Sequence, residues 1–390
     1  MKYTSLLLSG LLVAAASIAY AADAPESECE AEVFSLWDEQ VAWPSPEERQ
    51  RPAGAVDVLV HRACEEYRFL HDNAVVWHGD TLFAAWYNCP SGEIVGSSSI
   101  RGRRSRDGGK TWSQVEVIAS DHQGEGIFYV PIAFHSHRDT LYGYVTTMVG
   151  HDLVVNCEVY VLDEVTDQWK SRGVIADRFL PNCTPVLMED GNYIMAGRVA
   201  DKPKTKPEWP AVAISNGDNI TEPWTVIRLM DDRLKVFPET SVWVDGKNIT
   251  AISRCRPDQT PNGCSSPGRV FTSSDYGRTW CGPICHNLPE LQDTKVYGGS
   301  LSSGQRYLVW TTPPAREGLV IAVSRPGEEQ LAAVWQLQHG RSAELGVGPE
   351  WSYPYAVEHD GKLYVIYTSQ KKHSVMTIIP VASLELGKKT

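Results

Sequence analysis

The sequence has little positive charge and hardly any long apolar segment. Its 390 residues contain 36 lysines and arginines against 48 aspartates and glutamates, which gives a formal net charge of −12. Such a chain is a poor partner for nucleic acid, and an acidic ligand would have to be held by a local cluster of arginines. Residues 6–18 form its one long apolar run, which is too short to cross a membrane. We therefore expect no nucleic-acid partner and no membrane span.

The apolar run near the N-terminus is typical of a secretory signal. Met1 and Lys2 precede it, and Ala19-Tyr20-Ala21 follows it as a cleavage site before Ala22. We therefore predict a signal peptide over residues 1–21 and a mature protein that is secreted or periplasmic.

The nine cysteines are an odd number for an exported protein, so at least one thiol is free or pairs with another molecule. Cys255 and Cys264 are near enough in sequence to close a small loop, and so are Cys281 and Cys285. Spacing alone leaves the pairing open.

Helical periodicity is absent, and the chain instead repeats one unit. Trp112, Trp169, Trp224, Trp280 and Trp335 are separated by 57, 55, 56 and 55 residues, and so regular a period indicates a repeat protein. A turn followed by an apolar strand occurs six times, over residues 81–86, 140–145, 193–198, 249–254, 306–311 and 362–367. Another strand runs into each turn, so the unit is a hairpin with outer strands, the size of one four-stranded propeller blade.

This register divides the chain into a lead-in and six blades. The lead-in covers residues 22–56, with residues 32–37 as a candidate strand that closes the ring against the last blade. The propeller covers residues 57–390, with blades over residues 57–113, 114–170, 171–225, 226–281, 282–336 and 337–390.

Two copies of one octet support this division. Residues 105–112 (SRDGGKTW) and 273–280 (SSDYGRTW) both read S-x-D-x-G-x-T-W. In such an octet the Asp carboxylate can accept backbone N–H bonds inside a tight turn, Gly supplies a positive φ, and Trp buries its ring. The octet resembles the Asp-box of the sialidase (neuraminidase) superfamily of BNR-repeat proteins. That resemblance implies an all-β fold, a six-bladed β-propeller of sialidase type.

Propeller geometry predicts where functional side chains gather. The start of the first strand and the end of the second lie at the same edge of a hairpin, so across six blades these positions surround one mouth of the channel. The positions at first-strand starts and second-strand ends are ionisable or polar: Arg68, His71, Asp72, Tyr129, Asn182, Glu239, Tyr297, Tyr353, Asn88, Arg198, Arg254 and Thr312. Arginines that converge on such a mouth suit an anionic sugar, because a guanidinium binds a carboxylate through two parallel hydrogen bonds.

The resemblance to sialidases implies roles for several of these residues. The family binds the substrate carboxylate with three arginines, and the matching segments here carry Arg68, Arg254 and Arg316. It uses a Tyr nucleophile activated by a Glu, and the matching residues are Tyr353 and Glu239. Tyr353 lies one residue out of register against the turn at residues 360–361. A neutral phenol suits this chemistry because the anomeric carbon already bears a carboxylate, which would repel an anionic nucleophile.

The family's acid/base Asp has no counterpart in this sequence. Where the family keeps it on a loop, the chain reads NCPSGE over residues 88–93. Glu93 and Asp72 are the two candidates for the proton transfer. Arg198, His71, His137 and Asn182 complete the predicted substrate-binding set.

The histidines leave other hypotheses open. His135 and His137 alternate onto one strand face and can bind a metal if a third ligand joins them, but no third ligand is recognisable, so we expect a polar cluster and neither metal nor cofactor. Histidine beside Tyr and Arg also suits β-elimination from a uronic acid, the reaction of polysaccharide lyases on similar propellers. The hypotheses are therefore a sialidase-like hydrolase of an anionic glycan, a uronate lyase, and a glycan-binding propeller without turnover.

Overall fold

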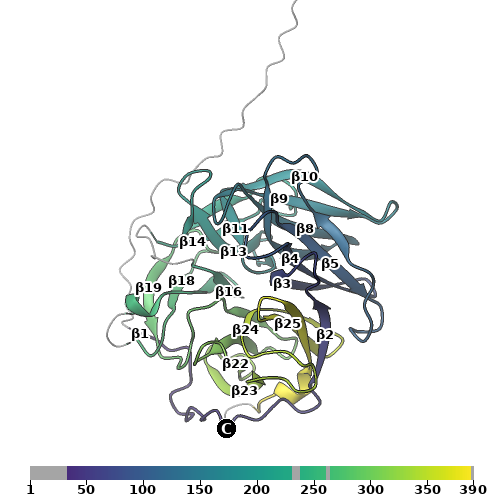
Figure 1. Cartoon of the computed structure of the whole chain (residues 1–390). Helices are drawn as coiled ribbons and strands as arrows, with labels where there is room; N and C mark the ends of the chain where they lie inside the picture. The colour runs from purple at the N-terminus through teal and green to yellow at the C-terminus, as the bar shows by residue number, and fades with distance from the viewer. Residues whose placement is uncertain (1–32, 231–237, 261–263, 388–390) are drawn as a thin grey trace, which may run out of the picture.

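A computed structural model describes residues 33–230, 238–260 and 264–387. The predicted signal peptide lies outside the described residues. Six antiparallel sheets of four or five strands are arranged around a common centre, where β3 (Phe69–His78), β16 (Thr240–Asp245) and β24 (Trp351–His359) approach one another (Figure 1). The structure thus confirms the predicted all-β, six-bladed propeller. Within the described ranges, no helix is long and apolar enough to cross a membrane.

In each blade consecutive strands form an antiparallel meander from the centre outwards, and the N-terminal strands β1 and β2 are added at the outer edges of blades 4 and 6. Blade 1 consists of β3 with β4 (Thr81–Cys89), β5 (Ser99–Ser105) and β6 (Glu116–Ala119). Blade 2 consists of β7 (Phe128–His137), β8 (Thr140–Met148), β9 (Val154–Asp163) and β10 (Gln168–Asp177). Blade 3 consists of β11 (Phe179–Pro181), β12 (Val186–Leu187), β13 (Tyr193–Ala200), β14 (Pro207–Ile214) and β15 (Thr225–Arg228).

The remaining strands follow the same plan. Blade 4 consists of β16 with β17 (Asn248–Ser253), β18 (Arg269–Ser273) and β19 (Cys281–His286). Blade 5 consists of β20 (Tyr297–Ser300), β21 (Arg306–Thr312), β22 (Gly318–Ser324) and β23 (Leu331–His339). Blade 6 contains β24 with β25 (Lys362–Ser369) and β26 (His373–Pro380). Two short 3-10 helices, η1 (Pro257–Gln259) and η2 (Val381–Leu384), complete the elements. The six predicted second strands correspond to β4, β8, β13, β17, β21 and β25.

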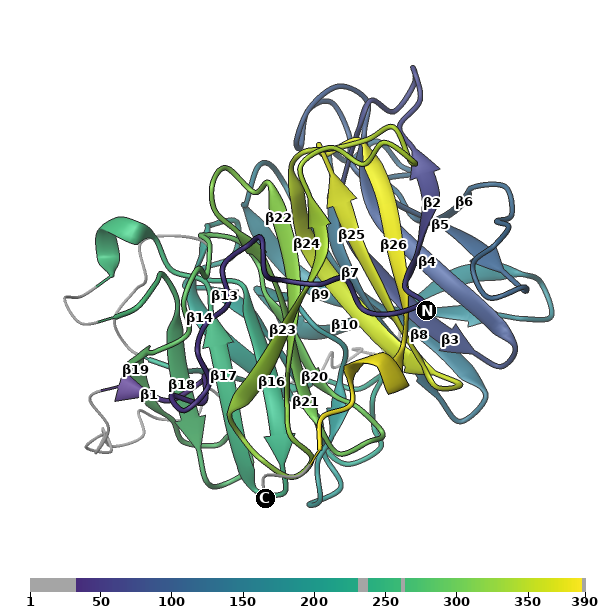
Figure 2. The same cartoon turned by 90° about the horizontal axis from the view of Figure 1, so that it is seen from below.

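An N-terminal strand closes the ring, but it is not the predicted one. β2 (Val56–Arg62) pairs antiparallel with β26 as the outer strand of blade 6, and Figure 2 shows the two side by side. The candidate segment at residues 32–37 instead forms β1 (Val33–Phe34), which lies parallel to β19 of blade 4, and a bridge from Trp37 to Leu331 of blade 5. This pairing takes the fourth strand of blade 6 from the N-terminal part of the chain and so closes the ring between the first and last blades.

Both octets form the expected turn. In the second, Asp275 accepts hydrogen bonds from the backbone N–H of Thr279 at 2.9 Å and from the Thr279 hydroxyl at 2.7 Å. Gly277 has a φ of 77° and donates its N–H to Ser273 Oγ at 2.9 Å, while Trp280 Nε1 donates to the Gly277 carbonyl at 2.8 Å. The first octet repeats this arrangement around Asp107. The octet therefore stabilises a turn between outer strands of a blade.

The cysteines pair differently from the two small loops considered. Cys264 is bonded to Cys285, which ties the segment before β18 to the end of β19. Cys64, Cys89, Cys157 and Cys183 are free thiols, as the odd number of cysteines predicts.

We expect Asp275→Ala to destabilise the fold by about 1–3 kcal/mol, because the substitution leaves a set of polar groups inside the turn without their acceptor. Chemical unfolding measures this loss. The control is Asp258→Ala, because Asp258 is an exposed residue of the same blade that lies 3.4 Å from an exposed Arg256. An equal loss in both variants would contradict a special role for the octet.

Candidate active site

Three first strands, β3, β7 and β24, carry a β-bulge at the same end, and in β3 and β24 the bulge holds a non-glycine residue with a positive φ. The pairing of β3 with β4 shifts between His71 and Ala74, and that of β24 with β25 shifts between Ser352 and Tyr355. The residues within these bulges, Asp72 and Tyr353, have φ values of 49° and 57°. Non-glycine residues in this left-handed region carry backbone strain, which in proteins clusters at functional sites. The extra residue in β24 also explains why Tyr353 lies one position out of register in the sequence.

The bulge in β24 directs Tyr353 to a carboxylate from another blade. Its hydroxyl donates a hydrogen bond to Oε1 of Glu239 at 2.7 Å. Glu239, immediately before β16, is 1% exposed, and Arg254, immediately after β17, donates Nη1 to both of its oxygens at 2.9 and 3.2 Å. The same Nη1 lies 3.1 Å from the Tyr353 hydroxyl. Blades 4 and 6 therefore meet in one hydrogen-bonded group.

Further cations surround this group. Arg198 Nη2, from β13, lies 3.9 Å from Glu239 Oε1. Arg254 Nε donates to Asp293 Oδ1 at 2.6 Å, and Arg316 Nη2 donates to the backbone carbonyl of the same Asp293 at 3.4 Å. Arg198, Arg254 and Arg316 thus come from blades 3, 4 and 5, and Arg254 shares Glu239 with Arg198 and Asp293 with Arg316. Arg316 Nη1 also lies 3.6 Å from Glu350 Oε1. We call these three arginines the arginine cluster.

The charges in this group set the protonation of the pair. Burial raises the pKa of Glu239, but the positive charges of Arg254 and Arg198 and the hydrogen bond from Tyr353 outweigh burial and bring the net pKa below its usual value. Burial, followed by the neighbouring Glu239 carboxylate, raises the pKa of Tyr353 well above 10. At neutral pH the structure therefore holds a neutral phenol against an ionised carboxylate.

The bulge in β3 brings a second buried pair beside the first. Asp72 is 6% exposed and accepts a hydrogen bond from Lys295 Nζ at 2.6 Å. Burial raises the pKa of Asp72 more than this lysine lowers it. The ring of His71 lies 4.1 Å from that of Tyr353, and burial, together with the charges of Lys371 and Arg316, holds the pKa of His71 well below 6.5. His71 is therefore a neutral imidazole, with Nδ1 3.1 Å from the Thr368 hydroxyl.

A small cavity joins these groups at the mouth predicted from the sequence. Side chains from four blades line it: His71, Asp72, Tyr87, Glu93, His151, Asp152, Arg198 and Tyr353. Glu93 accepts hydrogen bonds there from the Tyr87 hydroxyl at 3.1 Å and from Lys371 Nζ at 2.7 Å. The cavity thus places the Arg198 guanidinium, the Tyr353 phenol, carboxylates and a neutral imidazole around one space, while Arg254 and Arg316 are not among its lining residues.

Three of the predicted binding residues lie elsewhere or serve the fold. Arg68 is exposed, precedes β3, and donates Nε to the Pro90 carbonyl at 3.4 Å. Asn182 accepts the N–H of Thr240 at 3.1 Å and so joins blades 3 and 4. His137 is at the other end of its strand, where Nδ1 lies 3.0 Å from the Tyr193 hydroxyl.

The His135 and His137 pair forms a polar cluster. Their rings stack at 5.6 Å, and His137 Nε2 lies 3.7 Å from Asp218, a carboxylate that also pairs with Arg138. In the part of the chain that the structure describes, no three His, Cys, Asp or Glu side chains are grouped so that they could hold a metal ion.

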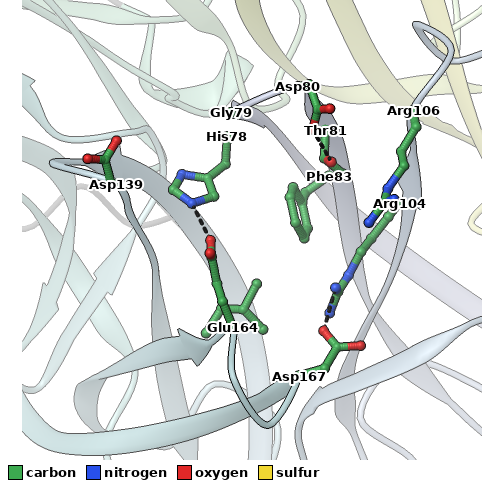
Figure 3. A pocket seen from close by; sticks show the side chains of 11 residues that line it. His78, Gly79, Asp80, Thr81, Phe83, Arg104, Arg106, Asp139, Glu164 and Asp167 are labelled. Atoms are coloured by element: carbon green, nitrogen blue, oxygen red, sulfur yellow. Dashed lines mark hydrogen bonds and ion pairs between the residues drawn. The ribbon is translucent and has the colours of Figure 1, made fainter.

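Another cavity lies on the opposite face, between the turns of blades 1 and 2 (Figure 3). Two ion pairs lie in it: His78 Nε2 is 2.9 Å from Glu164, and Arg104 Nη1 is 2.6 Å from Asp167. The mouth is the stronger candidate site because it holds the hydrogen-bonded Tyr353 and Glu239, whereas none of the residues lining this cavity is a tyrosine.

Sequence reasoning missed four residues at the mouth. Lys295 and Asp293 precede β20, and His151 and Asp152 lie in the turn between β8 and β9. None belongs to a recognisable motif. The position of the turn, at the same edge as the predicted mouth, is the one signal that would have found His151 and Asp152.

Comparisons with known proteins agree with this architecture. The family described as a BNR repeat-like domain matches residues 80–365. The fold is similar to a protein of unknown function from Dyadobacter fermentans, with a TM-score of 0.63 and 16% identity over 84% of this chain and 99% of that one. It is also similar to a Hadza microbial sialidase, with a TM-score of 0.63 and 13% identity over 82% of this chain and 67% of that one.

A third similar structure is Trypanosoma rangeli sialidase with 2,3-difluorosialic acid, described as a covalent intermediate. Its TM-score is 0.62, with 12% identity over 86% of this chain and 60% of that one. The chain therefore spans about 60% of the length of that sialidase. At these identities the likeness shows the fold alone. A search among curated proteins finds no match.

We expect Glu239→Gln to destabilise the protein by about 3–5 kcal/mol at neutral pH, because Arg254 and Arg198 lose a buried counter-charge. The folded-state pKa of Glu239 is lowered, so its contribution is fully present above its usual pKa of 4.5 and is lost as the pH falls below that value. Unfolding measured against pH should therefore show a constant gap between wild type and variant near neutrality that narrows in acid. A gap that widens in acid would contradict an ionised Glu239.

Proposed function

Because the chain belongs to the BNR repeat-like domain family, we propose that it is a glycoside hydrolase that acts on an anionic sugar of the sialic-acid type. One observation carries the proposal: the hydroxyl of Tyr353 donates to the buried, ionised Glu239 directly beside the arginine cluster. A phenol paired with a carboxylate is suited to nucleophilic attack at an anomeric carbon, and adjacent guanidinium groups are suited to a carboxylate on that carbon.

The arginine cluster binds the sugar carboxylate in this proposal. The chain carries a formal net charge of −12, so an anionic sugar is repelled by the molecule as a whole and needs concentrated local positive charge. Arg198, Arg254 and Arg316 supply this charge from three blades, and Lys295 adds a further cation 5.9 Å from the centre of the Tyr353 ring. Arg68 takes no part, because it is exposed outside the cluster.

Tyr353 and Glu239 carry the covalent step. As the glycosidic bond breaks, the Tyr353 oxygen forms a bond to the anomeric carbon and its proton passes to Glu239 Oε1, 2.7 Å away. The phenol is neutral before the attack because its pKa is raised well above 10, and Glu239 is ionised because its pKa is lowered. Each group therefore begins in the protonation state that the step requires.

A uronate lyase is the second candidate, and the neutral His71 favours it. The ring of His71 packs against Tyr353, close to positively charged side chains. In a lyase such cations neutralise the carboxylate of the uronic acid, and the imidazole takes the proton from the adjacent C5 carbon. A binding propeller without turnover is the third candidate, which the absence of the family's Asp from residues 88–93 favours.

We expect Tyr353→Phe to lower the release of free sialic acid from a fluorogenic sialoside by about 1,000-fold or more, since the nucleophile is lost. Tyr364→Phe is the matched control, because Tyr364 lies on the neighbouring β25 and its ring centre is 5.5 Å from that of Trp77, near the opposite end of the strands. Unsaturated product from a uronate polysaccharide would instead identify a lyase, and binding with neither product would identify the third candidate.

We expect Arg316→Ala to lower kcat/KM for the same substrate by about 100-fold, because a charge-assisted hydrogen bond to the carboxylate is worth roughly 1.5–3 kcal/mol. Arg68→Ala should change it by less than about 3-fold, because an exposed side chain outside the cluster contributes little. Equal losses in both variants would contradict the assignment of the carboxylate to the arginine cluster.

A further inference from the structure

Two residues that line the catalytic cavity have no role in the mechanism above. His151 and Asp152 lie in the turn between β8 and β9 of blade 2, and both face the same cavity as Tyr353, Asp72 and Glu93. Hydrolysis through a covalent intermediate needs a group that protonates the leaving oxygen and later removes a proton from water. Tyr353 and Glu239 are occupied with the nucleophilic attack, so this group has to be another residue at the cavity.

The two acids considered from the sequence are both held by lysines. Asp72 accepts from Lys295 Nζ at 2.6 Å, and Glu93 accepts from Lys371 Nζ at 2.7 Å. Glu93 also accepts from the Tyr87 hydroxyl at 3.1 Å. Each of these acids therefore has a carboxylate oxygen that a lysine ammonium already occupies.

His151 and Asp152 are arranged differently. Asp152 is 8% exposed and has a φ of 59°, and its Oδ2 lies 2.6 Å from His151 Nδ1. This contact has the length of an ion pair without the alignment of a hydrogen bond, and in the described residues Oδ2 has no other partner. The His151 side chain is 52% exposed. A buried carboxylate thus lies beside one nitrogen of a half-exposed imidazole.

We propose that His151 is the acid/base of this site and that Asp152 is its positioning residue. The proposal rests on the proposed hydrolase function. An imidazole held at Nδ1 by a carboxylate presents Nε2 to the substrate, which is the arrangement of an oriented general acid and base. The half-exposed position suits a leaving group that departs towards solvent, while Tyr353 attacks from the enclosed part of the cavity.

The proton balance is complete with these residues. In the first step Nε2 of His151 gives its proton to the glycosidic oxygen as the bond to the anomeric carbon breaks, the Tyr353 oxygen bonds to that carbon, and the phenolic proton passes to Glu239. In the second step water gives a proton to His151 Nε2 and its oxygen bonds to the anomeric carbon. The bond to Tyr353 then breaks, and Glu239 returns the proton to the phenol.

The dependence of activity on the leaving group tests this proposal. A sialoside with an alcohol leaving group, such as another sugar, needs protonation, whereas an aryl sialoside with an acidic phenol needs it far less. We expect His151→Ala to lower kcat/KM on the sugar-linked substrate by about 100-fold or more and on the aryl substrate by less than about 10-fold. Asp152→Asn should show the same selectivity with a smaller loss, and added imidazole should restore part of the His151→Ala activity.

The control is His78→Ala, because His78 forms a similar pair with Glu164 on the opposite face of the propeller (Figure 3). It should leave both substrates unaffected. The proposal would be overturned if His151→Ala lost equal activity on both substrates. It would also be overturned if the selective loss appeared in Asp72→Asn or Glu93→Gln instead. Either result would leave the proposed hydrolase function standing. A wild-type protein that turns over neither substrate would overturn the proposed function itself, so the two failures are distinguishable.

Discussion

The structure of the site depends on the buried negative charge of Glu239. A carboxylate with 1% exposure is very unfavourable unless cations and hydrogen-bond donors compensate it. Arg254, Arg198 and the Tyr353 hydroxyl do so from three different blades. Because this compensation requires all three blades to hold their positions, the same charge that fixes the Tyr353 and Glu239 pair also fixes the arginine cluster around it.

Two features of the propeller make this arrangement possible. Closure of the ring by β2 and β26 fixes blade 6 against blade 1, so the bulges at Asp72 and Tyr353 adjoin each other at one mouth. The octet turns stabilise the outer strands at the other end of the blades. The fold therefore separates stabilising turns from reactive side chains, with the histidine pairs and the cavity of Figure 3 on the side of the turns.

The sequence predicted the fold well because each blade repeats local signals. The tryptophan period, the octets and the hairpin turns are visible within a few residues of one another, and all six second strands lie where they indicated. Ring closure could not be predicted in the same way, since the pairing of β2 with β26 joins strands that are far apart in the sequence and carries no local pattern.

The site was predictable only where a residue lies in a regular strand or a family motif. Glu239 and Tyr353 were predicted to share one mouth and their side chains meet there, although the bulge that places Tyr353 is invisible until the pairing of β24 and β25 is known. Arg68 looked suitable by spacing, but β3 begins at Phe69 and leaves Arg68 exposed. His151 and Asp152 come from a turn, and the position of a turn over a cavity follows from the ring and not from the turn's own sequence.

The central claim is that Tyr353 attacks an anomeric carbon beside the arginine cluster. The most direct measurement is peptide mass spectrometry of the protein after incubation with 2,3-difluorosialic acid. The account predicts a covalent sugar adduct on Tyr353. An adduct on another residue, or none under conditions where the protein is folded and active, would contradict it.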